Sequence, residues 1–368
     1  MSLLKVKLGM VQSAKGILKS LSIFFIVTFI LGELTFQLLK PSIPYQYAPQ
    51  KVIENFWEES PVVESTLKKS HKSRFLRSGA SFDSIVQTNS LGWRDDEPDS
   101  RNKILVMGDS FTFGWGVNNN ETIPSNLEEI YHNEYDFINL GFTAGTSPDS
   151  YATYLRFHKE LQNISTILVL YSNDWHDIKR NICVHENGSI SKSPTPSCNK
   201  IVGTETVIKN GARFFGTKPI IISKFPISVI HWLKQSYMIA SIRTIVSVLS
   251  NTRIKEIQAR ESAENLTEDD KGRMHALLNE IFHLTGKSLI IVSLDSDDET
   301  RKQNNSFYGV VEKYCDFNNE IHCLSISPLD KTKVFENDLH YNYLGTEYVA
   351  NIIQDFMEDI NFLKSKNL

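Results

Sequence analysis

Residues 103–117 read KILVMGDSFTFGWGV, and this stretch decides the fold. Its short apolar run, residues 104–107, ends abruptly at Gly108. A run of this kind is typical of a buried strand in an α/β sheet, and ligands bind outside the carboxyl ends of such strands. Because Gly108 permits a tight turn, the stretch predicts that Ser110 is presented at the sheet edge. Ser110 is then either a nucleophile or a helix-capping residue.

Three later segments supply the polar residues that a serine nucleophile needs. Residues 137–145 (FINLGFTAG) predict a strand that opens into a glycine loop. Residues 166–174 (TILVLYSND) predict a strand that ends at Asn173. Residues 336–345 (ENDLHYNYLG) place acidic residues and His340 just before a last predicted helix. Together they provide a base, an acid and oxyanion donors for acyl transfer.

Taken in order, these four blocks resemble those of the SGNH/GDSL hydrolase family. The first block of the family is GDS with the nucleophilic serine, which Ser110 matches. The second block holds an oxyanion glycine, which lies here within residues 139–145. The third is G-x-N-D, whose asparagine lends its amide to the oxyanion hole, and Asn173 matches it. The last is an Asp-His pair before the closing helix, matched by Asp338 and His340.

The resemblance covers residues 89–360, with a divergent middle. It implies the fold class α/β, a three-layer α/β/α arrangement with a parallel five-stranded sheet of the flavodoxin-like SGNH type. The helices expected over residues 121–132 and 147–162 alternate with the strands, which independently predicts a parallel sheet. The implied activity is hydrolysis of ester bonds without a cofactor. No Cys/His cluster in the sequence has zinc spacing, so we expect no metal.

The sequence departs from the family pattern at three positions. Tyr171 stands where the third block usually has glycine. The second block is longer than usual, so Gly141 and Gly145 compete for the oxyanion role, and Gly145 is preferred because it lies farther into the loop. The last block usually reads D-x-x-H, which places Asn337 at the acid position. Asp338 is preferred as the triad acid because an imidazolium needs an anion beside it.

The expected mechanism is acyl transfer through a catalytic triad. His340 takes the proton of Ser110, and Asp338 fixes the imidazole tautomer and stabilises its charged form. The backbone N–H groups of Ser110 and Gly145, with the Asn173 amide, form the expected oxyanion hole.

The composition is that of an ordinary globular protein. The chain has 368 residues, of which 41% are hydrophobic and 22% charged, with a formal net charge of −4. The length allows one large α/β domain or two small ones. The chain has no excess of basic residues, so its composition does not indicate binding of nucleic acid.

The amino end predicts a membrane anchor. Residues 1–16 contain lysines and no acid, and residues 17–39 are apolar, interrupted by Glu33 toward the far end. A helix of that length spans about 30 Å of hydrocarbon. The basic flank predicts a cytoplasmic tail, which places the rest of the chain in the periplasm or outside the cell. A cleaved signal peptide is the alternative, although no small-x-small cleavage site follows the apolar core.

The remainder divides into two parts. Residues 40–88 are polar and proline-containing, and we interpret them as a tether and lead-in segment. Residues 89–368 form the expected SGNH hydrolase-like catalytic domain, with a divergent helical insertion over residues 181–284. Residues 226–249 of that insertion are strongly apolar and predict a lid, a membrane-facing helix or, most commonly, a helix packed on the sheet.

The sequence contains four cysteines, and export makes disulfides feasible. Pairing of Cys183 with Cys198 would close the divergent loop. Pairing of Cys315 with Cys323 would tie a predicted helix to the next strand. We expect both pairs, from the three complete pairings that four cysteines allow.

Three functions stay open. The first is a serine esterase that cleaves acetyl or other acyl esters at the outer side of a membrane. The second is an SGNH-type O-acetyltransferase that modifies a cell-envelope polysaccharide, with a membrane partner as acyl donor. The third is a non-catalytic binding protein on the same fold. The partners expected are therefore an acyl-ester substrate, a cell-envelope glycan or lipid, and the membrane itself through residues 17–39. Because a binding module has no need of Ser110, Asn173 and His340 together, the residues favour an enzyme.

Overall fold

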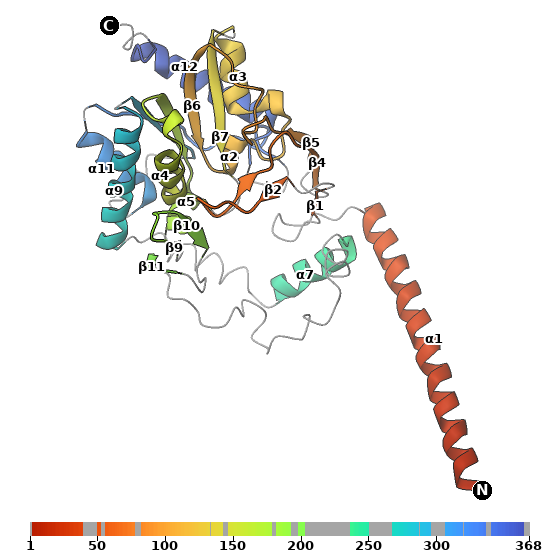
Figure 1. Ribbon diagram of the computed structural model, residues 1–368. Coiled ribbons are helices and arrows are strands. Elements are labelled where there is room, and N and C mark those ends of the chain that lie inside the picture. Colours follow the sequence, from red (N-terminus) through yellow and green to blue (C-terminus); the bar gives the residue numbers. More distant parts are fainter. Residues whose placement is uncertain are drawn as a thin grey trace.

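The structure is a computed structural model of the chain. It describes residues 2–39, 50–52, 56–77, 82–132, 134–142, 146–178, 182–192, 198–202, 236–249, 267–286, 288–295, 306–318, 320–335 and 340–363. A long helix, α1 (Ser2–Leu39), projects away from the folded remainder of the chain, and the C-terminus lies at the opposite end (Figure 1).

The core is a five-stranded sheet whose strands all run parallel. In spatial order the strands are β13 (His322–Ser325), β12 (Leu289–Ser293), β8 (Ser165–Leu170), β6 (Asn102–Gly108) and β7 (Tyr135–Gly141). At the end of β6, Gly108 pairs with Gly141 of β7 on one side and with Val169 of β8 on the other. The carboxyl ends of β6, β7 and β8 therefore meet at one edge of the sheet.

Helices cover both faces of this sheet, which confirms the predicted three-layer α/β/α fold (Figure 1). One face carries α3 (Ile123–Ile130) and α12 (Tyr343–Asp359), and the other carries α4 (Pro148–Phe157), α5 (Ser172–Ile178), α9 (Glu268–Leu284) and α11 (Phe307–Asp316). Side chains of β6 alternate between the faces: Leu105 and Met107 join one core cluster, and Ile104 and Val106 join the other. This two-sided burial explains the continuous apolar run in the sequence.

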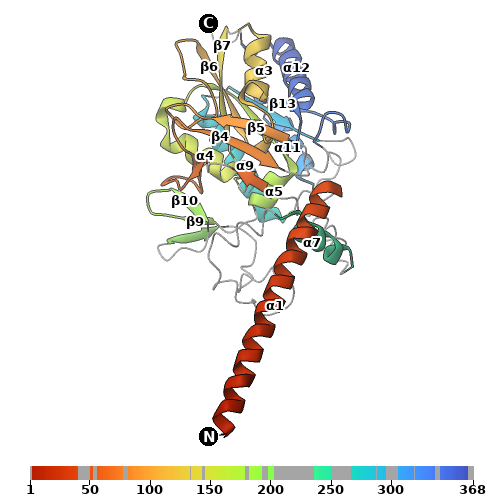
Figure 2. The same ribbon diagram turned by 90° about the vertical axis from the view of Figure 1, so that its right-hand side faces the viewer.

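The lead-in segment differs from the prediction. We interpreted residues 40–88 as a tether, but they contain strands. The strands β4 (Lys72–Arg77) and β5 (Phe82–Gln87) form an antiparallel pair (Figure 2). On the other side of β4, β1 (Gln50–Val52) pairs with it, also antiparallel. A second pair joins β2 (Trp57–Glu58) to β3 (Thr66–Leu67). The tether interpretation is wrong for the described part, because the alternating buried side chains of β5 pack into an aromatic cluster with residues that follow Ser110.

The insertion also differs from the prediction. Its first part forms a small antiparallel sheet of β9 (Ile182–Val184), β10 (Ile190–Lys192) and β11 (Lys200–Val202). The predicted boundary at residue 284 is wrong, because α9 places Met274, Leu278 and Ile281 in the core of the α/β domain. Residues 203–235 and 250–266 lie outside the described residues.

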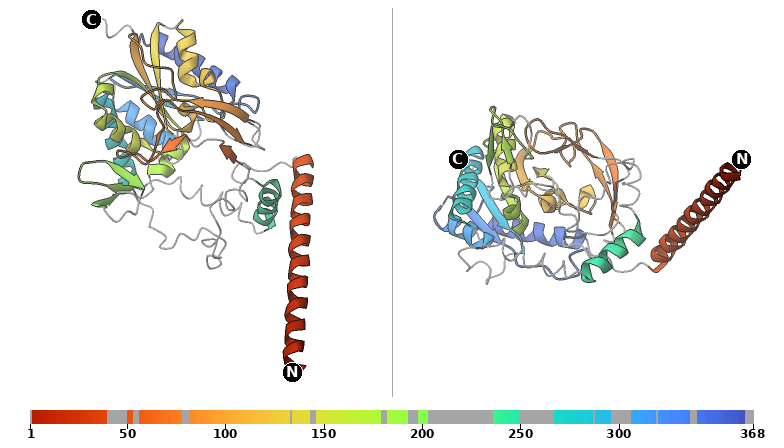
Figure 3. Two further views of the ribbon diagram at one scale, coloured as in Figure 1. Left: turned by 45° about the vertical axis from the view of Figure 1, so that its right-hand side comes forward. Right: turned by 90° about the horizontal axis from the view of Figure 1, so that it is seen from below.

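The apolar helix α7 (Tyr237–Leu249) packs beside α1 (Figure 3). The expectation that it packs on the sheet is wrong, because the described side chains of α7 belong to neither core cluster. The apolar part of α1, Lys19–Leu38, is long enough and apolar enough to cross a membrane, a test that a signal sequence also passes. Its large side chains, such as Phe24 and Phe25, are exposed.

Both predicted disulfides are confirmed. Cys183 and Cys198 have Cα atoms 5.3 Å apart, so β9 is tied to the residues just before β11. Cys315 and Cys323 have Cα atoms 6.3 Å apart, so α11 is tied to β13. Both separations lie in the range that a disulfide spans.

Candidate active site

A serine and a histidine meet at the carboxyl edge of the sheet. Ser110 is the first residue of α2 (Ser110–Phe113), which begins directly after β6. His340 lies shortly before α12, 230 residues later in the sequence. The Oγ atom of Ser110 lies 2.7 Å from Nε2 of His340. This is the separation that a nucleophile and its general base need for proton transfer.

The backbone around Ser110 is held by its neighbours in the chain. Asp109 caps α2, and its side chain accepts a hydrogen bond from the Phe111 N–H at 2.9 Å. The helix ends at Gly114, which adopts the left-handed conformation with φ of 83°. The amino end of α2 thus directs the Ser110 side chain out of the sheet edge toward His340.

Glycines at two adjacent strand ends allow α2 to lie directly on the sheet. A Cβ atom on Gly108 would lie 2.5 Å from the carbonyl oxygen of Val169. A Cβ atom on Gly141 would lie 2.0 Å from the backbone nitrogen of Phe113. Any larger residue at either position would push α2 off the sheet edge.

Gly141 has a structural role at the end of β7. Its N–H donates a hydrogen bond to Oδ1 of Asn139 at 2.9 Å, so this donor is already used. The preference for Gly145 over Gly141 therefore stands as a prediction, and Gly145 itself lies outside the described residues.

The His340 ring is positioned by aromatic neighbours and by its backbone. Its ring centroid lies 4.9 Å from that of Phe111 and 5.5 Å from that of Trp115. The carbonyl oxygen of His340 accepts a hydrogen bond from the Phe335 N–H at 3.0 Å. Asn337 and Asp338, the two candidates for the triad acid, lie outside the described residues. The choice between them stays a prediction.

The third block brings Asn173 and Tyr171 to the same edge. Asn173 lies in the first turn of α5, directly after β8. The ring of Tyr171, which departs from the family pattern, lies 4.4 Å from that of Phe111. Tyr171 therefore fills the space beside the nucleophile helix.

Two buried carboxyl groups lie near Ser110, and the sequence analysis did not identify them as a pair. Asp109 and Asp174 are 3% and 0% exposed. Asp174 accepts hydrogen bonds from the Tyr151 hydroxyl at 2.8 Å and from the Tyr171 N–H at 2.9 Å. Burial raises the pKa of both carboxyls, and the charge of Asp109 raises the pKa of Asp174 further. The only signal in the sequence was the position of Asp174 next to Asn173.

The raised pKa of Asp174 predicts a pH-dependent loss of stability. Because the folded state holds the proton more tightly than the unfolded state, this contribution is present below about pH 4 and is lost as the pH rises toward the raised pKa. Asp174→Asn cannot ionise, so its free energy of unfolding should improve relative to wild type as the pH rises. Urea unfolding of both proteins from about pH 4 to about pH 8 measures this difference. A difference that does not change with pH would contradict the prediction.

Arg94 is a buried cation that clamps the chain after α2, and the sequence analysis also missed it. Its side chain is 1% exposed, and its guanidinium donates to backbone carbonyls of Phe113 at 2.8 Å, of Gly114 and of Val117. Its Nε donates to Oδ1 of Asn119 at 3.0 Å. Burial lowers the pKa of Arg94 to about 9, which leaves the group charged at neutral pH. The planar fork of donors explains why arginine occupies this position.

We expect Arg94→Met to destabilise the fold and to reduce activity. Methionine keeps much of the side-chain volume but donates no hydrogen bond, and each buried carbonyl left without a donor costs about 1–3 kcal/mol. The free energy of unfolding should therefore fall by about 3 kcal/mol or more. Denaturant unfolding measures the loss, and Arg74→Met, at an arginine that is half exposed, is the matched control. Equal stabilities of the two variants would contradict the clamp.

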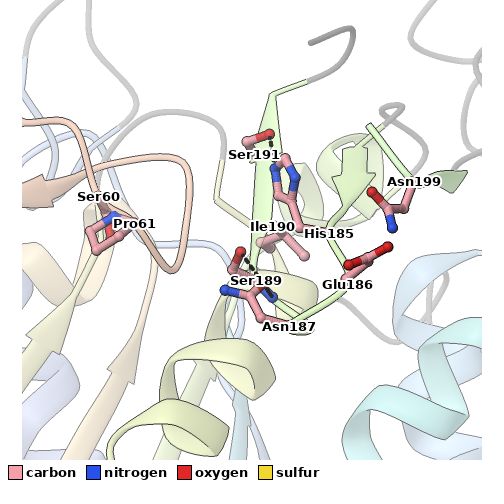
Figure 4. Close-up of a pocket in the computed structure, with 9 residues that line it drawn as sticks. All are labelled: Ser60, Pro61, His185, Glu186, Asn187, Ser189, Ile190, Ser191 and Asn199. Atoms are coloured by element: carbon pink, nitrogen blue, oxygen red, sulfur yellow. Dashed lines mark hydrogen bonds between the residues drawn. The ribbon is translucent and has the colours of Figure 1, made fainter. Parts of the chain in front are cut away.

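Two cavities lie on the described part of the fold. A cavity of about 500 Å³ lies between the turn at Ser60 and the hairpin of β9 and β10, as Figure 4 shows. A smaller cavity of about 260 Å³ adjoins the carboxyl end of β7 and is lined by Trp93, Asn139 and Gly141 among others. Neither includes Ser110 or His340 in its lining. Within the described ranges, no group of three or more His, Cys, Asp or Glu side chains is arranged to hold a metal ion.

Comparison with known proteins finds several solved structures that match this chain, two of which are described here. One is an acetyl xylan esterase (Est2A) from the rumen bacterium Butyrivibrio proteoclasticus, at 10% identity and a TM-score of 0.37, covering 73% of this chain and 66% of that one. The other, from Bacteroides ovatus ATCC 8483, is described as a GDSL-like lipase, at 12% identity and a TM-score of 0.33, covering 86% of this chain and 81% of that one. No protein-family model and no curated protein matches the chain. At these scores the likeness says nothing about individual residues.

Proposed function

We propose that this chain is a serine ester hydrolase of the SGNH/GDSL type, with Ser110 as nucleophile and His340 as general base. One observation carries the proposal: two residues that are 230 positions apart in the sequence lie 2.7 Å apart, through Oγ and Nε2, at the carboxyl edge of the sheet. The order of the four sequence blocks supports the same assignment. A non-catalytic binding role gives no reason for this hydrogen bond.

In the proposed reaction, Nε2 of His340 takes the proton of Ser110 as Oγ attacks the ester carbonyl carbon. The developing oxyanion is held by the N–H groups of Ser110 and Gly145 and by the Asn173 amide. His340 then gives the proton to the leaving alcohol, which leaves an acyl group on Ser110. Water, activated by the same histidine, releases the acid. Asp338 holds the imidazole in the required tautomer.

Transfer of the acyl group to a sugar hydroxyl is the second candidate function. It uses the same acyl-enzyme, with the hydroxyl of a cell-envelope glycan in place of water. The apolar helix α1 supports this candidate, because as a single-pass anchor with its basic end in the cytoplasm it would bring the catalytic domain to the same side of the membrane as cell-envelope glycans. A membrane partner would then supply the acyl donor.

Product analysis separates hydrolysis from transfer. The full chain is incubated with p-nitrophenyl acetate, with and without a soluble oligosaccharide acceptor, and both free acetate and acetylated sugar are measured. We expect release of nitrophenol with free acetate as the main product. Acetylated sugar as the main product would favour the transferase. No turnover of any ester tested, by protein that is folded, would contradict both enzymatic functions.

A further inference from the structure

The acidic residue that interrupts the apolar part of α1 is bound to a second helix. Glu33 accepts hydrogen bonds from the Ser236 hydroxyl at 2.6 Å, from the Tyr237 N–H at 2.9 Å and from the Met238 N–H at 3.1 Å. These three residues form the amino end of α7, which is 203 to 205 positions away in the sequence. Glu33 is therefore not an arbitrary defect in the apolar helix, because it holds α7 on α1.

This contact satisfies groups that a lipid environment would leave unpaired. The first N–H groups of any helix lack partners within the helix. In α7, Glu33 binds the N–H groups of Tyr237 and Met238, and the Ser236 hydroxyl accepts from the Ile239 N–H at 3.1 Å. Water would serve these groups equally well at an exposed surface. Inside a bilayer they need protein partners, which Glu33 and Ser236 supply.

The two helices approach closely at the residue next to Glu33. The flexible side chain of Met238 packs against Gly32, where a Cβ atom would lie 2.4 Å from its sulfur atom, so the methionine would have to shift if the glycine were replaced. Small residues at such crossings are typical of helices that pack within membranes. The hydrogen bonds and the packing thus fix the same end of α7 to the same turn of α1.

The rest of α7 leaves an apolar face uncovered. Ile242, Ile245 and Val246 are 46%, 53% and 38% exposed, and their spacing places them on one side of the helix. The neighbouring helix α1 exposes its own apolar side chains at Leu31 and Leu34. Figures 2 and 3 show α7 beside the outer part of α1, below the folded domain. This apolar face therefore lies on a helix that packs beside the candidate membrane helix.

The depth of the contact agrees with a position at the membrane surface. The apolar span ends at Leu38, which places Glu33 about 7.5 Å from that end along the helix, at about 1.5 Å per residue. Helices that lie in the interface bury their apolar faces about 5–10 Å into the boundary between headgroups and acyl chains.

We propose that α7 is an interfacial helix, which lies in the outer leaflet of the bilayer that α1 spans and contacts acyl chains through Ile242, Ile245 and Val246. This inference rests on the proposed membrane anchoring and is independent of the ester chemistry. As an interfacial helix, α7 gives the catalytic domain a second lipid contact. This contact holds the domain close to the membrane surface and restricts its motion relative to α1.

Depth measurement with spin labels tests the proposal. In the described residues all cysteines are in disulfides, so a single added cysteine can be labelled selectively. The full chain carrying Ile242→Cys or Ile245→Cys is placed in vesicles of phosphatidylethanolamine and phosphatidylglycerol. Accessibility of the label to oxygen and to a water-soluble nickel complex is then compared. Ile26→Cys, at an exposed position within the apolar span, is the lipid control, and Glu347→Cys on α12 is the water control.

We expect the oxygen-to-nickel accessibility ratio at Ile242 and Ile245 to exceed that at Glu347 several-fold and to approach that at Ile26. A ratio equal to that at Glu347 would place α7 in water and overturn the proposal. Labels inaccessible to both reagents would show that protein covers the face, which also overturns it. If the Ile26 label itself lies in water, the membrane anchor fails and the interfacial helix fails with it, while the ester chemistry is untouched.

A substitution at Glu33 tests the docking contact separately. Glu33→Gln replaces one acceptor oxygen by a donor, so the label at Ile245 should become more mobile and its accessibility ratio should fall several-fold. Gln37→Ala is the matched control, because Gln37 donates to Glu33 at 3.0 Å without contacting α7 through that bond. Equal depth and mobility at Ile245 in all three backgrounds would contradict the role of Glu33.

Discussion

Replacing Ser110 by alanine is expected to lower kcat for p-nitrophenyl acetate by about 10⁴- to 10⁶-fold and to leave the fold intact. The Ser110 hydroxyl makes its described side-chain hydrogen bond to His340. Alanine keeps the Cβ atom and the backbone of α2. The catalytic loss should therefore appear without a matching loss of stability.

Two measurements check this prediction together. Initial rates give the loss of turnover, and thermal unfolding shows whether the variant is folded. Ser325→Ala is the control, since Ser325 is an exposed serine at the end of β13 on the same sheet edge. If Ser110→Ala keeps most of the wild-type rate, Ser110 is not the nucleophile. If both serine variants lose activity equally, the loss is not specific to the proposed site.

Asp338→Ala is expected to reduce kcat by about 10⁴-fold, and Asn337→Ala to change it only mildly. The imidazolium that forms at His340 needs a negative charge beside it, and of these two residues only aspartate carries one. The fold should survive both changes, so the comparison isolates the catalytic role. His340→Ala sets the scale of the complete loss of the base.

The reverse ranking of the two variants would identify Asn337 as the residue that orients His340. Equal and small effects would mean that neither residue orients the base. Both rates are measured on p-nitrophenyl acetate with protein whose unfolding midpoint matches wild type, so that a folding defect is not mistaken for a catalytic one.

The lead-in strands are part of the proposed site, which a simple tether would not be. The ring of Trp115 lies 4.6 Å from that of Phe75 in β4 and 5.5 Å from that of His340. Phe113, which ends α2, packs in the same cluster as Phe56 and Phe75. The segment before the first core strand therefore supports both the nucleophile helix and the ring of the general base.

The sheet and its polar edge were predictable because their signals are local. The apolar run before Gly108 is continuous because β6 is buried on both faces. The strands β7 and β8 lead directly into the second and third of the four sequence blocks, so their ends could also be recognised. The disulfides were predictable for a similar reason, because each closes a short segment of the sequence.

What the sequence could not show depends on contacts between distant residues. The strand β5 has a clear alternation, but it is short, and its packing partners Phe113 and Trp115 come from beyond the next strand. Arg94 donates to backbone carbonyls, and because every residue has such a carbonyl, the sequence does not reveal these partners. The position of α7 depends on Glu33, a residue of another helix more than 200 positions away.

Covalent trapping of Ser110 tests the central claim most directly. The full chain is treated with a fluorophosphonate, which reacts with activated serine hydroxyls, and the site of the adduct is found by peptide mass spectrometry. The account predicts one adduct, on Ser110, that is absent in Ser110→Ala and strongly reduced in His340→Ala. Folded protein that gives no adduct, or an adduct on another serine that survives both substitutions, would contradict the assignment of Ser110 and His340 as nucleophile and base.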